Sequence, residues 1–156
     1  MTMRGEARTL IWALRLAIIA YATALLVTTH LPWVRMPPPG PSMITPDKIY
    51  HVAAYGVLGF LIAVLRALRS GDTPPVHGRT LTLLAVLAVA DEVTQPWFNR
   101  VCDPLDAVFD VVGALAGGVA GWLAVVLVRR LAARAAIASN RGVGGCGPPA
   151  NRRGSR

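Results

Sequence analysis

The fold is decided by residues 81–95, LTLLAVLAVADEVTQ, in which ten mostly apolar residues lead directly into two adjacent carboxylates. The apolar part has the composition of a helix that lies in a bilayer. Asp91 and Glu92, at the edge of the hydrocarbon, are costly there unless they are paired or have a function. Acidic residues in such a position indicate a functional site. The other residues of that site must come from elsewhere in the sequence.

Three other apolar runs resemble this one, and together the four predict helices at about 9–29, 46–69, 79–98 and 104–130. Each run is close to the ~20 residues that a helix needs to cross a ~30 Å hydrocarbon core. The chain of 156 residues is 54% hydrophobic and only 15% charged, which is too apolar for an ordinary soluble domain. We predict an all-α integral membrane bundle of four transmembrane helices over residues 1–134. A flexible, basic tail rich in glycine and proline follows at 135–156.

The basic residues predict the orientation of this bundle. Most lie at the two ends of the chain and in the connection between the second and third runs: Arg4, Arg8, Arg66, Arg69, Arg79, Arg129, Arg130 and Arg134. The other two connections hold only Arg35, Lys48 and Arg100. Since cytoplasmic loops are enriched in Lys and Arg, both termini are expected in the cytoplasm. The chain is then expected to be a multi-pass protein of the cell membrane.

The same distribution bears on partners. A net charge of +8 could suggest a nucleic-acid partner, but the basic residues flank apolar runs and no nucleic-acid-binding motif is present. The lipid bilayer, with its anionic head groups, is the expected partner instead. Cys102 and Cys146 are expected on opposite sides of the membrane, where they cannot bridge within one chain.

Six of the eight acidic residues fall at the outer ends of the last three runs: Asp47, Asp91, Glu92, Asp103, Asp106 and Asp110. Thr45 and Pro46 are typical of a helix start, and Asp47, His51 and Tyr55 then recur every four residues on one helix face. Asp103 is expected to cap the fourth helix. Asp106 and Asp110 would line one face of that helix, continued by Gly113, Gly117 and Gly121, which are expected to serve helix packing.

Helix direction separates the acids that are easily explained from those that are not. The second and fourth helices begin at the outer face, where their positive dipole ends favour acidic residues. The third helix ends there, near Gln95, because Pro96 disfavours helical geometry in the residue before it. Asp91 and Glu92 therefore need a proton, a metal or cationic partners, for which Lys48, Arg100 and protonated His51 are available. His30 and His77 are expected in loops.

These arguments predict one polar site on the outer membrane face. Its candidate residues are Asp47, Lys48, His51, Tyr55, Asp91, Glu92, Gln95, Arg100, Asp106 and Asp110. No catalytic residue is assigned to it, and no cofactor or resident metal is predicted. The oligomeric state is not predicted either.

The spaced residues Asp47-Lys48-xx-His51-xxx-Tyr55, then Asp91-Glu92-xx-Gln95, Arg100, Asp106, Gly113 and Gly117, resemble the VanZ-like family. These are small bacterial multi-helix membrane proteins named for a teicoplanin-resistance protein. The resemblance spans roughly residues 47–121, about half the chain. It implies a membrane location and an association with low-level glycopeptide resistance.

The chain departs from the family pattern at three positions. Val52 stands where the family usually has an aromatic residue, Asp110 where it has asparagine, and Asp103 where it has a small hydroxyl residue. The change at Asp110 adds a charge, so a hydrogen-bonding role of the family's asparagine does not transfer directly.

Three functions stay open from the sequence. The outer site could have a binding or modulating role in the cell envelope, in which it contacts a lipid-linked cell-wall precursor, a glycopeptide or a partner protein. It could be an enzyme in which His51, Asp91, Glu92 and Asp110 hold a hard divalent ion for hydrolysis. It could be a structural ion-pair network. No Ser-His-Asp, P-loop or HExxH spacing supports a specific reaction.

Overall fold

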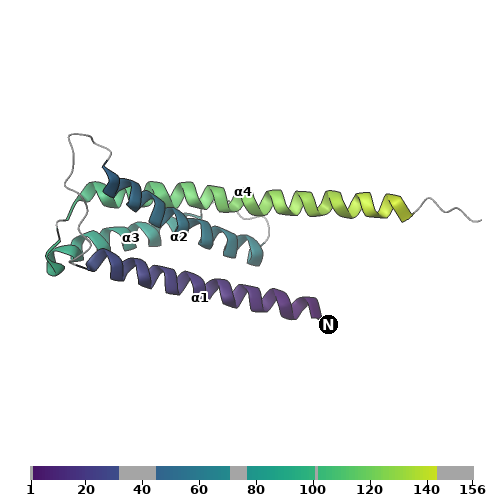
Figure 1. Cartoon of the computed structure of the whole chain (residues 1–156), viewed down its shortest axis with the longest axis horizontal. Helices are drawn as coiled ribbons and strands as arrows, with labels where there is room; N and C mark the ends of the chain where they lie inside the picture. The colour runs from purple at the N-terminus through teal and green to yellow at the C-terminus, as the bar shows by residue number, and fades with distance from the viewer. Residues whose placement is uncertain (1, 32–44, 71–76, 101, 144–156) are drawn as a thin grey trace, which may run out of the picture. The chain divides into compact units, whose positions relative to one another are not determined.

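The computed structural model describes residues 2–31, 45–70, 77–100 and 102–143, and these residues form helices and no strand. The elements are α1 (Thr2–His30), α2 (Pro46–Ser70), α3 (Gly78–Thr94), the 3-10 helix η1 (Gln95–Phe98) and α4 (Pro104–Val143) (Figure 1). The expected all-α class is confirmed. The proline-rich segment 32–44, the connection 71–76 and residues 144–156 lie outside the described residues.

Four helical segments are long and apolar enough to cross a membrane: Gly5–His30, Pro46–Ser70, Gly78–Phe98 and Pro104–Ser139. Large apolar side chains such as Leu16, Leu83 and Val86 are more than 60% exposed, as lipid-facing residues would be. The described part of the chain therefore has the four helices, long and apolar enough to span a membrane, that the sequence predicts.

Helix α3 ends where Pro96 predicts. Asn99 adopts the left-handed conformation, with φ of 58°, which asparagine tolerates better than most residues. The amide of Asn99 donates to the Pro96 carbonyl, and that of Arg100 donates to the Gln95 carbonyl, both at 3.3 Å. This is the Schellman pattern of helix termination, and it turns the chain back directly before Arg100.

Helices α2 and α4 run parallel and contact each other backbone to backbone. A Cβ atom on Gly117 would clash with the Gly56 carbonyl, and one on Gly113 would clash with the Val52 carbonyl. A Cβ atom on Gly121 would lie 2.6 Å from the Phe60 carbonyl oxygen. In all three contacts the residue numbers on α2 and α4 differ by the same amount, so the two helices keep the same register over two turns.

The chain divides into two compact units, Met1–Val125 and Val126–Arg156. The first unit contains α1, α2, α3, η1 and the start of α4, and the second contains the remainder of α4. The expected helix end near residue 130 is too early, because α4 continues to Val143 and includes the first part of the predicted tail. The reason is local composition: this segment is rich in alanine, the strongest helix former.

Candidate functional site

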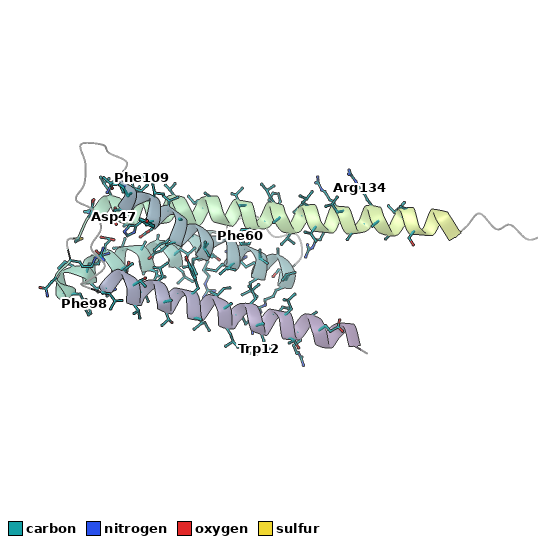
Figure 2. The ribbon with its side chains drawn as sticks, viewed as in Figure 1. Trp12, Asp47, Phe60, Phe98, Phe109 and Arg134 are labelled. Atoms are coloured by element: carbon teal, nitrogen blue, oxygen red, sulfur yellow. The ribbon has the colours of Figure 1, made fainter. Side chains whose placement is uncertain are left out.

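Charged and polar side chains are buried together at one end of the first unit. Asp47, Phe98 and Phe109 lie at this end and Trp12 toward the other (Figure 2). We call this group the polar cluster; its buried members are Lys48, His51, Asp91, Glu92, Gln95, Asp106 and Asp110. Asp47, Tyr55 and Asp103 adjoin it. Buried charges need partners, so the contacts of each side chain indicate what the cluster can do.

Lys48 joins α2 to the start of α4. Its Nζ atom donates to Asp103 Oδ2 at 2.8 Å and to Asp106 Oδ1 at 2.9 Å. The sequence analysis expected Lys48 as a partner of Asp91 and Glu92, but its ammonium group bonds these two residues of α4 instead. The Lys48 side chain thus reaches the N-terminus of α4.

Asp103 caps α4 as expected. Its Oδ1 atom accepts a hydrogen bond from the Leu105 amide at 2.9 Å, which satisfies one of the free amides of the first turn. The Lys48 ammonium group lowers the pKa of the Asp103 carboxyl below its ordinary value, and the Leu105 amide lowers it further.

His51 lies between three carboxylates of two helices, Asp47 of α2 and Asp106 and Asp110 of α4. Its Nδ1 atom is hydrogen-bonded to Asp110 Oδ1 at 2.9 Å. On the other side of the ring, Nε2 lies 3.6 Å from Asp106 Oδ2 and 4.0 Å from Asp47 Oδ1. The four-residue spacing on α2 and on α4 produces this arrangement, because both helices present one face to the other in parallel register.

Asp91 is held from α1, which the sequence analysis did not predict. Thr29 Oγ1 donates to Asp91 Oδ1 at 2.8 Å, and His30 Nδ1 lies 3.5 Å from the same oxygen. His30 was predicted in a loop, but it is the last residue of α1, and its Nε2 atom is hydrogen-bonded to Thr94 Oγ1 at 2.8 Å. One feature of the sequence could have indicated these contacts: the first apolar run has a polar end, with Thr29 and His30, and this end also lies at the predicted outer face.

Glu92 accepts hydrogen bonds from two amide groups. Its Oε1 atom accepts from Gln95 Nε2 at 2.8 Å, and its Oε2 atom accepts from the Asp103 amide at 3.1 Å. The carboxylate therefore ties the end of α3 to the residue that begins α4. These two amide donors were not among the partners predicted for Glu92.

Several buried oxygens of the cluster have no hydrogen-bond partner within the described ranges: Asp47 Oδ1, Tyr55 Oη, Asp91 Oδ2 and Asp110 Oδ2. Asp110 and Tyr55 are almost completely buried, at 0% and 1% exposure. An unpaired buried oxygen is unfavourable, so the cluster is built to accept additional hydrogen-bond donors or a cation.

An open pocket of about 210 Å³ lies beside the cluster. Its wall is partly apolar, and polar side chains from α1, α2 and the segment after η1 complete it. The lining residues are Leu25, Thr28, Thr29, Asp47, Tyr50, His51, Ala54, Tyr55 and Arg100. Of the predicted site residues, Asp47, His51, Tyr55 and Arg100 thus face one space.

Two groups of three residues have the composition and spacing of metal ligands: Asp47, His51 and Asp106, and His51, Glu92 and Asp110. In each group the ligand atoms lie within 4.8 Å of one another. His51 belongs to both, one ring nitrogen facing each side.

Searches with protein-family models, against curated proteins and against solved structures give no match for this chain. The resemblance to the VanZ-like family thus stays a prediction from the motif residues.

Proposed function

We propose that this chain is a VanZ-like multi-pass protein of the bacterial cytoplasmic membrane that binds a lipid-linked cell-wall precursor. In this proposal both termini are cytoplasmic and the polar cluster faces outward. The orientation is supported by the twelve basic residues at the termini and in the second connection, against three in the other two connections.

The observation that carries the proposal is the pocket beside the polar cluster. Leu25 and Ala54 give it an apolar wall, whereas Asp47, His51 and Arg100 give it charged or titratable groups. A ligand suited to such a pocket has an apolar part and a polar head that both donates and accepts hydrogen bonds. A lipid-linked wall precursor has this chemistry, and it is present at the outer face of the bacterial membrane.

The position of the pocket within the membrane-spanning helices supports the same ligand class. Thr28 and Thr29 belong to the last turn of α1, and Tyr50 and Ala54 to the first turns of α2. A lipid-anchored molecule could reach this depth while its hydrocarbon chain stays in the bilayer. Protection against teicoplanin would then follow from altered access to the precursor.

The test is a susceptibility assay in a bacterial host that expresses the full chain. We expect the wild-type protein to reduce teicoplanin susceptibility, and Ala54→Trp, which fills the pocket, to abolish the effect. Ala53→Trp is the matched control, since Ala53 is the exposed neighbour on the same helix. Membrane abundance is measured for each variant.

Two results contradict the proposal. Wild-type protein present at normal abundance without any shift in susceptibility would remove the glycopeptide link. Equal protection by Ala54→Trp and Ala53→Trp would show that the pocket is not used.

The alternative of a purely structural ion-pair network is tested with substitutions in the polar cluster. Loss of abundance in every such variant, with no fully abundant but inactive one, would favour the structural network.

A further inference from the structure

We propose that Asp47, His51 and Asp106 bind one divalent transition-metal ion, with His51 coordinating through Nε2 and Asp110 orienting its ring. This site does not depend on the ligand of the pocket, because it is defined by the contacts of α2 with α4 alone.

The distances around Nε2 fit metal ligands better than hydrogen-bond partners. Asp106 Oδ2 at 3.6 Å and Asp47 Oδ1 at 4.0 Å are both too far from Nε2 for a hydrogen bond. Ligand atoms about 2.1 Å from a tetrahedral zinc ion are separated from one another by about 3.4 Å. The distances from Nε2 exceed this separation by about 0.2 Å for Asp106 and about 0.6 Å for Asp47, and one ligand atom from each of the three residues lies within 4.8 Å of the others.

The other ring nitrogen provides an independent observation. His51 is only 8% exposed, and its Nδ1 atom is hydrogen-bonded to Asp110, which is completely buried. If Nδ1 carries the proton, Nε2 presents its lone pair to Asp47 and Asp106. A carboxylate on the far nitrogen of a metal-binding histidine is the usual way in which proteins fix its tautomer and orientation.

Charge in the cluster favours a cation at this position. With the histidines neutral, the described residues at this end include six carboxylates and two basic side chains, Lys48 and Arg100. Asp47 Oδ1, which points toward Nε2, has no hydrogen-bond partner within the described part of the chain. A divalent ion would halve the excess of negative charge where low polarity strengthens every electrostatic interaction.

The alternative group on the Nδ1 side is less suitable. Both Glu92 oxygens already accept hydrogen bonds, from Gln95 and from the Asp103 amide. An ion there would also have to replace the hydrogen bond between His51 and Asp110. On the Nε2 side, Lys48 holds Asp106 through Oδ1, which leaves Oδ2 facing the histidine.

Access and ligand type complete the assignment. Asp47 and His51 line the open pocket, so an ion and a bound water can reach the site. One imidazole nitrogen with two carboxylate oxygens suits Zn²⁺ or Mn²⁺, and the stability order of these ions favours Zn²⁺.

The test is equilibrium dialysis of the purified full-length protein in detergent against ZnCl₂, after removal of metal with a chelator. The affinity tag must contain no histidine. We expect one Zn²⁺ per wild-type chain. Asp47→Asn and His51→Ala should bind at least ~10-fold more weakly, and Asp110→Asn ~10–100-fold more weakly. Asp103→Asn is the matched control, and its affinity should stay within about twofold of the wild type.

Circular dichroism of each variant distinguishes loss of a ligand from loss of fold. Folded wild-type protein that binds no Zn²⁺ would overturn the proposal. It would also be overturned if Glu92→Gln abolishes binding while folded Asp47→Asn binds like the wild type. Should His51→Ala fail to fold, Asp47→Asn decides the outcome, because Asp47 is the most exposed ligand, with 27% of its side chain accessible. A failed susceptibility test leaves these measurements unaffected.

Discussion

At the scale of single residues, Thr29 joins α1 to the buried carboxylate of Asp91. Its hydroxyl donates to Asp91 Oδ1, and the other Asp91 oxygen has no hydrogen-bond partner in the described residues. Thr29→Val should therefore lower the free energy of unfolding by about 1–3 kcal/mol, because a buried acceptor loses its donor. Thermal unfolding in detergent measures the change.

Thr28→Val is the control for this substitution. Thr28 Oγ1 donates only to carbonyls of its own helix, those of Ala24 and Leu25. We expect the thermal unfolding midpoint of Thr28→Val to stay near that of the wild type. Equal losses in both variants would mean that the bond between Thr29 and Asp91 contributes little.

The Lys48–Asp103 pair makes stability depend on acid pH. The Lys48 hydrogen bond lowers the pKa of Asp103 in the folded chain, so the unfolded chain binds its proton more readily. The pair's contribution is thus complete above the unfolded pKa near 4 and is lost as pH falls through the lower folded pKa. Asp103→Asn keeps a capping side chain but removes the charge.

Unfolding midpoints of wild type and Asp103→Asn between pH 7 and pH 3 test this expectation. The wild type should be the more stable protein at pH 6–7, and the difference should shrink toward pH 3. A difference that is constant over this range would show that the charge of Asp103 makes no contribution.

At the scale of helices, the contact between α2 and α4 depends on the absence of side chains. Gly117→Ala places a methyl group against the Gly56 carbonyl, a backbone atom that cannot rotate away. Helix separation should cost about 1–3 kcal/mol of stability despite the better helix propensity of alanine. Gly5→Ala, where nothing lies within 4 Å, should be neutral or slightly stabilising in the same assay. The reverse order would contradict the backbone contact.

Much of the helical architecture could be predicted from local sequence, because its determinants are local. Helix α3 gives way to a 3-10 helix at Gln95, directly before Pro96, and Asp103 caps α4 with its own carboxylate. The extension of α4 to Val143 was not predicted, because the segment after residue 130 is less apolar. Its helical structure follows from the helix propensity of its alanines.

The polar cluster could be predicted only in part, since its partners are set by packing between helices. Four-residue spacing put His51 and Asp110 each on one face of its own helix and both in the predicted site, and they are hydrogen-bonded. No local signal assigns Lys48 to Asp103 and Asp106, or Thr29 and His30 to Asp91. Those pairings require knowing which helix lies beside which.

At the scale of the whole molecule, the proposed orientation can be tested with the two cysteines. Cys102 is a free thiol near the polar cluster, and in the proposed topology it lies at the outer face. In a Cys146→Ser variant, a membrane-impermeant maleimide should label Cys102 in intact cells. In a Cys102→Ser, Cys146→Ser background, Ser139→Cys should be labelled only after the cells are permeabilised. The opposite pattern would invert the topology.

The parallel register of α2 and α4 has a mechanical consequence. Small residues and carbonyls repeat every four positions along the contact, so the helices can slide only in steps of one turn, about 5.4 Å. One step would place His51 beside Ala114 instead of Asp110 and would separate Lys48 from its two carboxylates. The ionic contacts thus select one of several sterically similar positions. Only in this position do Lys48 and His51 meet their carboxylates on α4.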